Sequence, residues 1–197
     1  MLEIETRAIV KNKEEIINIL KANGFVNTKN FLQQDIMFDK EDASLFRSGK
    51  KIRIRIEEET AELTYKGFIQ NDSTFSKREE LNLPIPLYLV MDYKHFLEEL
   101  GYPMLFQIKK YRSIWKKGEI IATLDDWPII GMILELEGIE SEIKKIMNFF
   151  PTLKFANYRL KELFGDKINE TGKDLEKLKQ EYFNETNFEI GRIELIF

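Results

Sequence analysis

Charged residues alternate with uncharged, mostly apolar ones at three separate places in this chain: Leu2–Ala8, Ile52–Ile56 and Leu134–Glu137. Because successive side chains of a β-strand point to opposite faces, each segment is expected to be a strand with one apolar and one charged face. The first and third segments put pairs of glutamates on the charged face, and the second puts a pair of arginines there. Such strands can build a site for a metal ion and a phosphate.

The composition is that of a folded protein with no general attraction for nucleic acid. Of the 197 residues, 43% are hydrophobic and 32% are charged, and 34 acidic residues outnumber 30 basic ones. The net charge of −4 provides no basic field for duplex nucleic acid, so any anion site must be local. The absence of cysteine excludes disulfides, thiolate zinc sites and cysteine nucleophiles. No signal peptide or long apolar run is evident, so we expect a cytoplasmic protein without membrane contacts.

Periodicity, glycines and prolines predict a strand, helix, strands pattern that occurs twice. Strands are expected at 2–10, 31–38, 52–56, 61–66, 75–83, 105–115, 119–124 and 129–138. Helices are expected at 13–23, 87–100, 140–150 and 154–164, followed by a charged helical stretch at 172–184 and a final strand at 188–197. This order favours a mostly antiparallel sheet that closes on itself.

Counting positions along the predicted strands puts their charged residues on one common face. These residues are Glu3, Glu5, Arg7, Arg53, Arg55, Glu62, Lys66, Arg78, Glu80, Lys110, Arg112, Asp125, Glu135 and Glu137. The opposite face is apolar on several strands, and the predicted helices can cover it. With helices outside, the charged face points inward, and a closed sheet of about eight strands can hold a small ligand. Arginine binds phosphate bidentately, and carboxylates bind Mg²⁺ or Mn²⁺.

A solvated polar face is the alternative interpretation, because alternation is the ordinary pattern of antiparallel strands. Two observations favour a charged channel. Arginine and glutamate pairs recur regularly on this face, and serine, threonine, asparagine and glutamine are scarce there. Trp115 and Trp127 are interpreted as packing residues, although one of them at the mouth of a channel could stack on a base.

Seven short motifs, in order, resemble the CYTH or triphosphate tunnel metalloenzyme superfamily, which includes class IV adenylyl cyclases and thiamine and inorganic triphosphatases. The opening Glu3–Arg7 is similar to the family's ExExK signature, with arginine in place of the lysine. The other segments are Gln34–Asp39 (QxDxYFD, with Met37 in place of the tyrosine), Ile52–Arg55 (LRIR), Leu63–Gly67 (LTxKG), Arg78–Glu80 (RxE), Ile108–Arg112 (KxR) and Leu124–Glu137 (LD, G, ExE).

The resemblance, which covers residues 1–165, implies an α+β fold. It consists of an eight-stranded antiparallel closed β tunnel with helices packed outside. On this basis we expect a tunnel domain at residues 1–170 and a helical C-terminal extension at 171–197, packed on or next to the tunnel. A homodimer is compatible with the resemblance, since relatives are often dimers.

The resemblance also implies roles for the charged residues. One or two divalent cations, Mg²⁺ or Mn²⁺, would be bound by Glu3, Glu5, Glu80, Asp125, Glu135 and Glu137. The triphosphate oxygens would be held by Arg53, Arg55, Lys66, Arg78, Lys110 and Arg112. Glu3, Glu5 and Arg7 are expected to be catalytic, with Arg7 at the tunnel end.

Three functions are compatible with these roles. We favour hydrolysis of a small triphosphate (tripolyphosphate, thiamine triphosphate or a nucleoside triphosphate), because water as the nucleophile needs no dedicated nucleobase pocket. A class IV-type adenylyl cyclase would instead convert ATP to cyclic AMP and pyrophosphate. A non-catalytic module that binds polyphosphate or nucleotide is the third; Arg7 in place of lysine favours it, and four glutamates at metal spacing argue against it.

Overall fold

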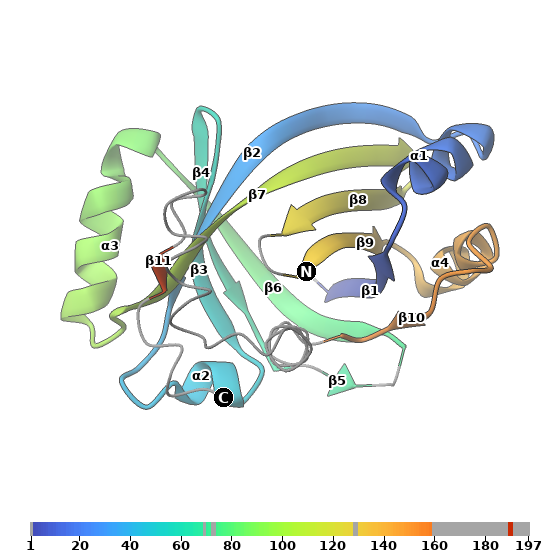
Figure 1. The fold of residues 1–197 in the computed structure, drawn as a ribbon. Coiled ribbons are helices and arrows are strands. Elements are labelled where there is room, and N and C mark those ends of the chain that lie inside the picture. The colour runs from blue at the N-terminus through green and yellow to red at the C-terminus, as the bar shows by residue number, and fades with distance from the viewer. Residues whose placement is uncertain (1, 69, 72–73, 128–129, 159–188, 191–197) are drawn as a thin grey trace, which may run out of the picture.

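Eight long strands close into one antiparallel barrel in the computed structural model, which describes residues 2–68, 70–71, 74–127, 130–158 and 189–190 (Figure 1). The barrel strands are β1 (Leu2–Val10), β2 (Val26–Phe38), β3 (Lys51–Glu57), β4 (Thr60–Lys66), β6 (Ser76–Ile85), β7 (Met104–Lys117), β8 (Ile120–Trp127) and β9 (Gly131–Glu137). Their order around the barrel is β1-β9-β8-β7-β2-β3-β4-β6, and pairing of β6 with β1 closes the ring. The predicted eight-stranded closed barrel is confirmed.

The helices are α1 (Lys13–Ala22), α2 (Ser44–Arg47), α3 (Val90–Glu99) and α4 (Glu140–Met147), and a 3-10 turn (Leu87–Leu89) precedes α3. Three two-residue strands complete the described part: β5 (Gln70–Asn71), β10 (Phe155–Ala156) and β11 (Glu189–Ile190). The helix predicted from residue 154 is wrong over 154–158. There β10 pairs with Arg7 and Ala8 of β1, beyond the point where β6 leaves that strand. Apart from β11, the expected C-terminal extension lies outside the described residues.

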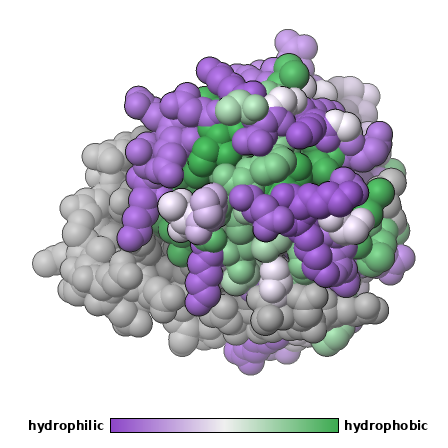
Figure 2. Space-filling model, turned by 90° about the vertical axis from the view of Figure 1, so that its right-hand side faces the viewer, coloured by the Kyte–Doolittle hydropathy of each residue, from purple (hydrophilic) through white to green (hydrophobic). Residues whose placement is uncertain are grey.

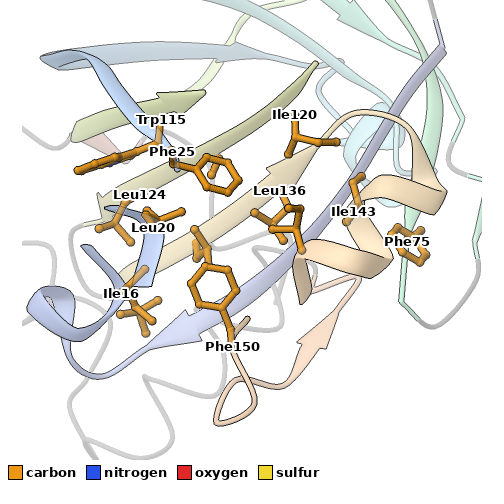
Figure 3. Close-up of a cluster of buried hydrophobic side chains, with 14 residues drawn as sticks. Ile16, Leu20, Phe25, Phe75, Trp115, Ile120, Leu124, Leu136, Ile143 and Phe150 are labelled. Carbon is orange, nitrogen blue, oxygen red and sulfur yellow. The ribbon is translucent and has the colours of Figure 1, made fainter. Parts of the chain in front are cut away.

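The main hydrophobic cluster lies outside the barrel wall, beneath α1 and α4 (Figure 3). Ile16 and Leu20 of α1 and Ile143 of α4 are fully buried or nearly so, and they share this cluster with Leu124 of β8 and Leu136 of β9. These strand residues have the opposite parity to Asp125, Glu135 and Glu137. The apolar face of the sheet therefore points outward to the helices, and the charged face points inward.

The opposite side of the barrel is covered by α3. Val90 and Leu97 of this helix are buried in one cluster with Ile54 of β3. The expectation that helices cover the apolar face fails on β6, where Leu81 is 53% exposed and Leu83 is 52% exposed.

The surface over α1 and α4 is chemically mixed. Figure 2 shows a hydrophobic area there with hydrophilic residues around it. Among the helices that the structure describes, none is long and apolar enough to cross a membrane.

Candidate functional site inside the barrel

A cavity of about 620 Å³ lies inside the barrel and is lined by residues of all eight long strands. Pockets of this size accommodate small organic ligands. Within the described chain, its cationic lining residues are Arg7, Lys51, Arg53, Arg55, Lys66, Arg78, Lys110 and Arg112. Its acidic lining residues are Glu3, Glu5, Asp35, Glu62, Glu80, Glu119, Glu135 and Glu137. Of the site residues predicted from the sequence, only Asp125 is not part of the lining.

Glu3 and Glu5 of β1 are held by cations from three strands. Lys66 Nζ lies 2.5 Å from Glu3 Oε1, and Arg78 Nε donates to Glu3 Oε2 over 2.9 Å. Glu5 Oε1 accepts from Arg78 Nη2 over 2.5 Å and from Arg7 Nη2 over 2.8 Å. The antiparallel register of β1 and β6, which sets Glu3 opposite Arg78, brings these groups together. The result is one buried network of acids and bases.

Glu80 of β6 extends this network to β3. Its carboxylate lies 2.8 Å from Lys66 Nζ and 3.6 Å from Arg53 Nη2. Burial acts to raise the pKa of Glu80, but the charges of Lys66 and Arg53 lower it to about 2. Arg53 is less well satisfied, because its buried Nε–H has no hydrogen-bond partner among the residues described. Arg53, which lines the cavity, is therefore incompletely satisfied by the protein itself.

Asp125 of β8 is fully buried and holds two cations of β7. It accepts from Lys110 Nζ over 2.6 Å and from Arg112 Nε and Nη2 over 2.7 and 2.5 Å. Arg112 Nη2 also lies 3.0 Å from Glu135 Oε2. Burial and the Arg112 charge lower the pKa of Lys110 to about 8, although Asp125 opposes this shift. Asp125, which does not line the cavity itself, thus positions Lys110 and Arg112, two residues expected to bind phosphate.

Arg7 joins these networks. Its guanidinium donates to Glu5, to Glu135 and, over 3.1 Å, to the backbone carbonyl of Tyr158. Burial opposes the charge, yet Glu5 and Glu135 raise the pKa of Arg7 above its already high ordinary value. The side chain is therefore permanently charged, and it cannot accept a proton from a nucleophile.

Asp35 of β2 belongs to the interior, although the sequence reasoning did not include it in the site. It accepts from Arg55 Nε over 2.9 Å and from Gln33 Nε2 over 2.9 Å. Burial acts to raise the pKa of Asp35, but Arg55 and Arg53 hold it well below its usual range. The signal was present, because Asp35 lies in one of the matched motifs and has the parity of the interior face.

Lys51 of β3 is a second residue that the sequence reasoning missed. It lines the cavity with the same parity as Arg53 and lies opposite Lys66 in the β3–β4 register. Burial, together with Arg78, Arg7 and Lys66, lowers its pKa well below the ordinary value. In the described part of the chain, no carboxylate lies within ion-pair distance of its ammonium group. Lys51 is therefore a lining amine without a counter-charge in the described chain, and a polyanion beside it would favour its protonated form.

Glu137 of β9 is the opposite case, a lining carboxylate for which no ion pair is found among the described residues. It lies opposite Glu5 in the β1–β9 register. Desolvation at the cavity wall and repulsion from Glu3 and Glu5 raise the pKa of Glu137 to about 7, and its side chain remains accessible to solvent. Three carboxylates crowded together are a fitting donor set for a hard divalent cation. No cluster of three acids in preformed metal geometry is found in the described chain, since Arg78, Arg7 and Lys66 hold Glu3 and Glu5.

One part of the cavity wall is apolar, which the sequence reasoning did not predict. Met37, Phe46, Phe106, Ile108 and Trp127 line it. Phe46 is placed by the short helix α2, in which the backbone N–H groups of Leu45 and Phe46 donate to the buried carboxylate of Asp39. The interior thus combines a charged part with an apolar part.

A sequence model of the CYTH domain matches residues 1–171 of this chain. The chain belongs to the CYTH family. The family assignment agrees with the resemblance of the seven motifs and with the closed barrel that surrounds paired acids and bases.

Individual relatives support the same assignment. A Methanocaldococcus jannaschii protein named as a candidate adenylate cyclase is 32% identical over 145 residues, which cover 74% of this CYTH chain and 81% of the relative. A Pyrococcus horikoshii protein of solved structure has a TM-score of 0.68 at 21% identity, over 84% of this chain and 99% of that one. A Hippeastrum protein, described as a candidate adenylyl cyclase with a dominant triphosphatase activity, has a TM-score of 0.63 at 18% identity, over 88% and 97%. The two structural matches show the shared fold.

Proposed function

We propose that this CYTH protein hydrolyses a small triphosphate inside the barrel with the help of a divalent cation, Mg²⁺ or Mn²⁺. The observation that supports this best is the unequal pairing of the interior cations. Most of them bind the protein's own carboxylates, but among the described residues Lys51 has no carboxylate within ion-pair distance and Arg53 has one, Glu80, at 3.6 Å. An interior with more cationic side chains than nearby carboxylates at this place is unfavourable by itself, and a polyanionic ligand would supply the missing negative charge.

The phosphate oxygens would be bound by side chains of the interior face. Half-buried Lys51 has no carboxylate partner in the described chain, and the buried Arg53 has an unsatisfied Nε–H, which costs about 1–3 kcal/mol. Arg55, Lys66, Arg78, Lys110 and Arg112, which are already oriented by carboxylates, would complete the shell. Charge-assisted bonds of this type are among the stronger hydrogen bonds in proteins.

The divalent cation would be held by Glu137 with Glu3 and Glu5. A carboxylate has several lone pairs, so Glu3 and Glu5 can accept from Arg78 and still offer oxygen to a metal. Glu80, Asp125 and Glu135 would hold the cationic side chains in place around it. When bound there, the cation would neutralise phosphate charge and favour attack by water.

Hydrolysis needs little more than this arrangement. Transfer of the terminal phosphoryl group to water depends mainly on positioning and charge neutralisation, which the interior arginines and lysines supply. The Hippeastrum relative, with its described triphosphatase activity, supports this choice. The Methanocaldococcus jannaschii relative, by its name, supports the adenylyl cyclase alternative.

The direct test is incubation with tripolyphosphate, thiamine triphosphate and ATP, each with Mg²⁺, with Mn²⁺ and with excess chelator. We expect metal-dependent release of orthophosphate. Formation of cyclic AMP and pyrophosphate from ATP would favour the cyclase. Tight tripolyphosphate binding without any product would favour the binding module.

Replacing Lys51 with methionine is expected to weaken tripolyphosphate binding about tenfold or more, because one charge-assisted hydrogen bond is lost. Thermal stability should stay equal or rise, since Lys51 lies among like charges. Isothermal titration calorimetry and thermal unfolding measure the two effects. Lys109→Met, on the outward side of β7, is the matched control and should leave binding unchanged. Loss of stability without loss of affinity in Lys51→Met would contradict the role.

The pKa of Lys110 near 8 predicts a pH effect on binding. As pH rises from 7 to 9 the ammonium loses its proton, so tripolyphosphate affinity should fall about three- to tenfold more in the wild type than in Lys110→Arg. Because the ligand ionises in the same way with both proteins, the difference between them reports the ionisation of Lys110.

The same group predicts a pH effect on stability. The pKa of Lys110 in the folded state lies below that of the unfolded chain, so the folded state binds fewer protons at this group. The stability of the wild type should therefore rise between pH 8 and 10.5 relative to Lys110→Arg. Parallel pH curves for the two proteins would contradict both expectations.

A further inference from the structure

The ion pairs inside the barrel join into one continuous chain of alternating charges. Each central member of this chain lies between two partners of the opposite charge. The central members, in the order in which they are linked, are Lys66, Glu3, Arg78, Glu5, Arg7 and Glu135. Glu80 continues the chain from Lys66, and Arg112 continues it from Glu135. Along this chain, the described interior therefore neutralises its own charge before any ligand enters.

Glu3 and Glu5 occupy cations that a triphosphate would need. Both glutamates line the cavity, as do their partners Lys66, Arg78 and Arg7. Arg78 donates to them from Nε and Nη2, over 2.9 and 2.5 Å, and its side chain is 2% exposed. A phosphate that approaches these cations meets two carboxylates that already accept from them. Because carboxylate and phosphate carry like charges, the two compete for the same donors.

Two other lining carboxylates provide the contrast. Glu62 accepts from the hydroxyl of Thr64 over 3.2 Å, and no ion pair is found for it in the part of the chain that the structure describes. Glu137 likewise holds no cation there. Competition for the cations is therefore a property of particular acids, and not of the negative charge of the interior as a whole.

We propose that Glu3 and Glu5 are an internal lock on the triphosphate site. They keep their three cationic partners occupied until the two carboxylates bind a divalent cation. The inference rests on the proposed function, because it involves the same divalent cation and the same triphosphate. Release of the glutamates leaves the three partners with unused donors, so the divalent cation and the triphosphate strengthen each other's binding. Without the divalent cation, a triphosphate binds weakly, through cations outside the lock.

The first test measures tripolyphosphate affinity by calorimetry in excess chelator. Glu5→Gln keeps the shape of the side chain but removes the charge that holds Arg78 and Arg7, so metal-free binding should become about tenfold tighter. Glu62→Gln, the matched control, removes the same charge from the lining without releasing a cation, and should change the affinity by less than about threefold. Equal changes in the two variants, or weaker binding in Glu5→Gln, would overturn the lock.

A measurement on the unaltered protein guards against a variant that fails to fold. Nuclear magnetic resonance of protein labelled with nitrogen-15 arginine follows the Nε–H group of Arg78, which donates to Glu3 in the ligand-free barrel. Arg78→Lys identifies this signal by removing it. The signal should shift on addition of tripolyphosphate with Mg²⁺ and stay nearly unchanged with tripolyphosphate in excess chelator. Shifts of the same size under both conditions, or no shift under either, would overturn the lock.

These measurements do not depend on turnover, so the lock and the proposed hydrolysis can fail separately. If Glu5→Gln binds metal-free tripolyphosphate more tightly but the wild type forms no orthophosphate, the lock stands and hydrolysis fails. If the wild type releases orthophosphate and the Arg78 signal shifts equally without the divalent cation, hydrolysis stands and the lock fails.

Discussion

Asp125→Asn is expected to lower the free energy of unfolding by about 3–5 kcal/mol, the loss typical of breaking a buried ion pair from one side. Asp125 is fully buried and accepts from both Lys110 and Arg112. Asparagine keeps the shape of the side chain but leaves these two buried cations without their shared counter-charge. Urea unfolding followed by circular dichroism measures the change, with the slope of the transition as a check on two-state behaviour.

The neighbouring Asp126 provides a matched control. It lies on the same strand but is exposed. Asp126→Asn makes the same chemical change outside the barrel and should alter stability by less than about 0.5 kcal/mol. Similar small effects of both substitutions would show that the Asp125 network is not needed for the fold. Tripolyphosphate binding should weaken in Asp125→Asn but not in Asp126→Asn, because only the first substitution takes away the group that orients Lys110 and Arg112.

Glu137→Gln should have the second large effect, a loss of turnover of about 100-fold together with a higher metal requirement, as expected for a disturbed metal environment. Glu137 is the best probe of metal binding, since its carboxylate supports no ion pair within the described chain and its loss should not unfold the protein. Initial rates across a Mn²⁺ titration, with tripolyphosphate as substrate, measure both effects.

The raised pKa of Glu137 adds a pH signature. With a pKa of about 7 in the absence of metal, protons compete with the cation, so at limiting Mn²⁺ the wild-type rate should rise through pH 7. Glu137→Gln should lack this rise. Glu59→Gln, which removes an exposed carboxylate, is the control and should match the wild type. An unchanged metal requirement in Glu137→Gln would remove this residue from the metal site.

The alternation of residues was sufficient to predict the barrel and its charged interior. Side-chain parity is fixed by the strand itself, so Glu3, Arg53 and Glu135 could be assigned to one face before any pairing was known. The partners of these residues could not be predicted, because Glu3 meets Lys66 and Arg78 only through the register of β1 with β6 and the packing across the barrel.

Other features escaped the sequence reasoning for equally physical reasons. Lys51 shares the parity of Arg53 but belongs to none of the matched motifs. Residues 155–156 were expected in a helix, but the free edge of β1 offers them strand partners. The apolar wall around Trp127 combines residues from β2, α2, β7 and β8, and only the closed barrel brings them together.

The nature of the nucleophile tests the central proposal most directly. The CYTH protein would be incubated with ATP and Mn²⁺ in water enriched in oxygen-18, and the products would be resolved by chromatography and mass spectrometry. Attack by water at the terminal phosphorus predicts ADP together with orthophosphate that carries one oxygen-18 atom. Cyclic AMP with unlabelled pyrophosphate would contradict hydrolysis, as would recovery of ATP unchanged together with thiamine triphosphate and tripolyphosphate unchanged in parallel incubations.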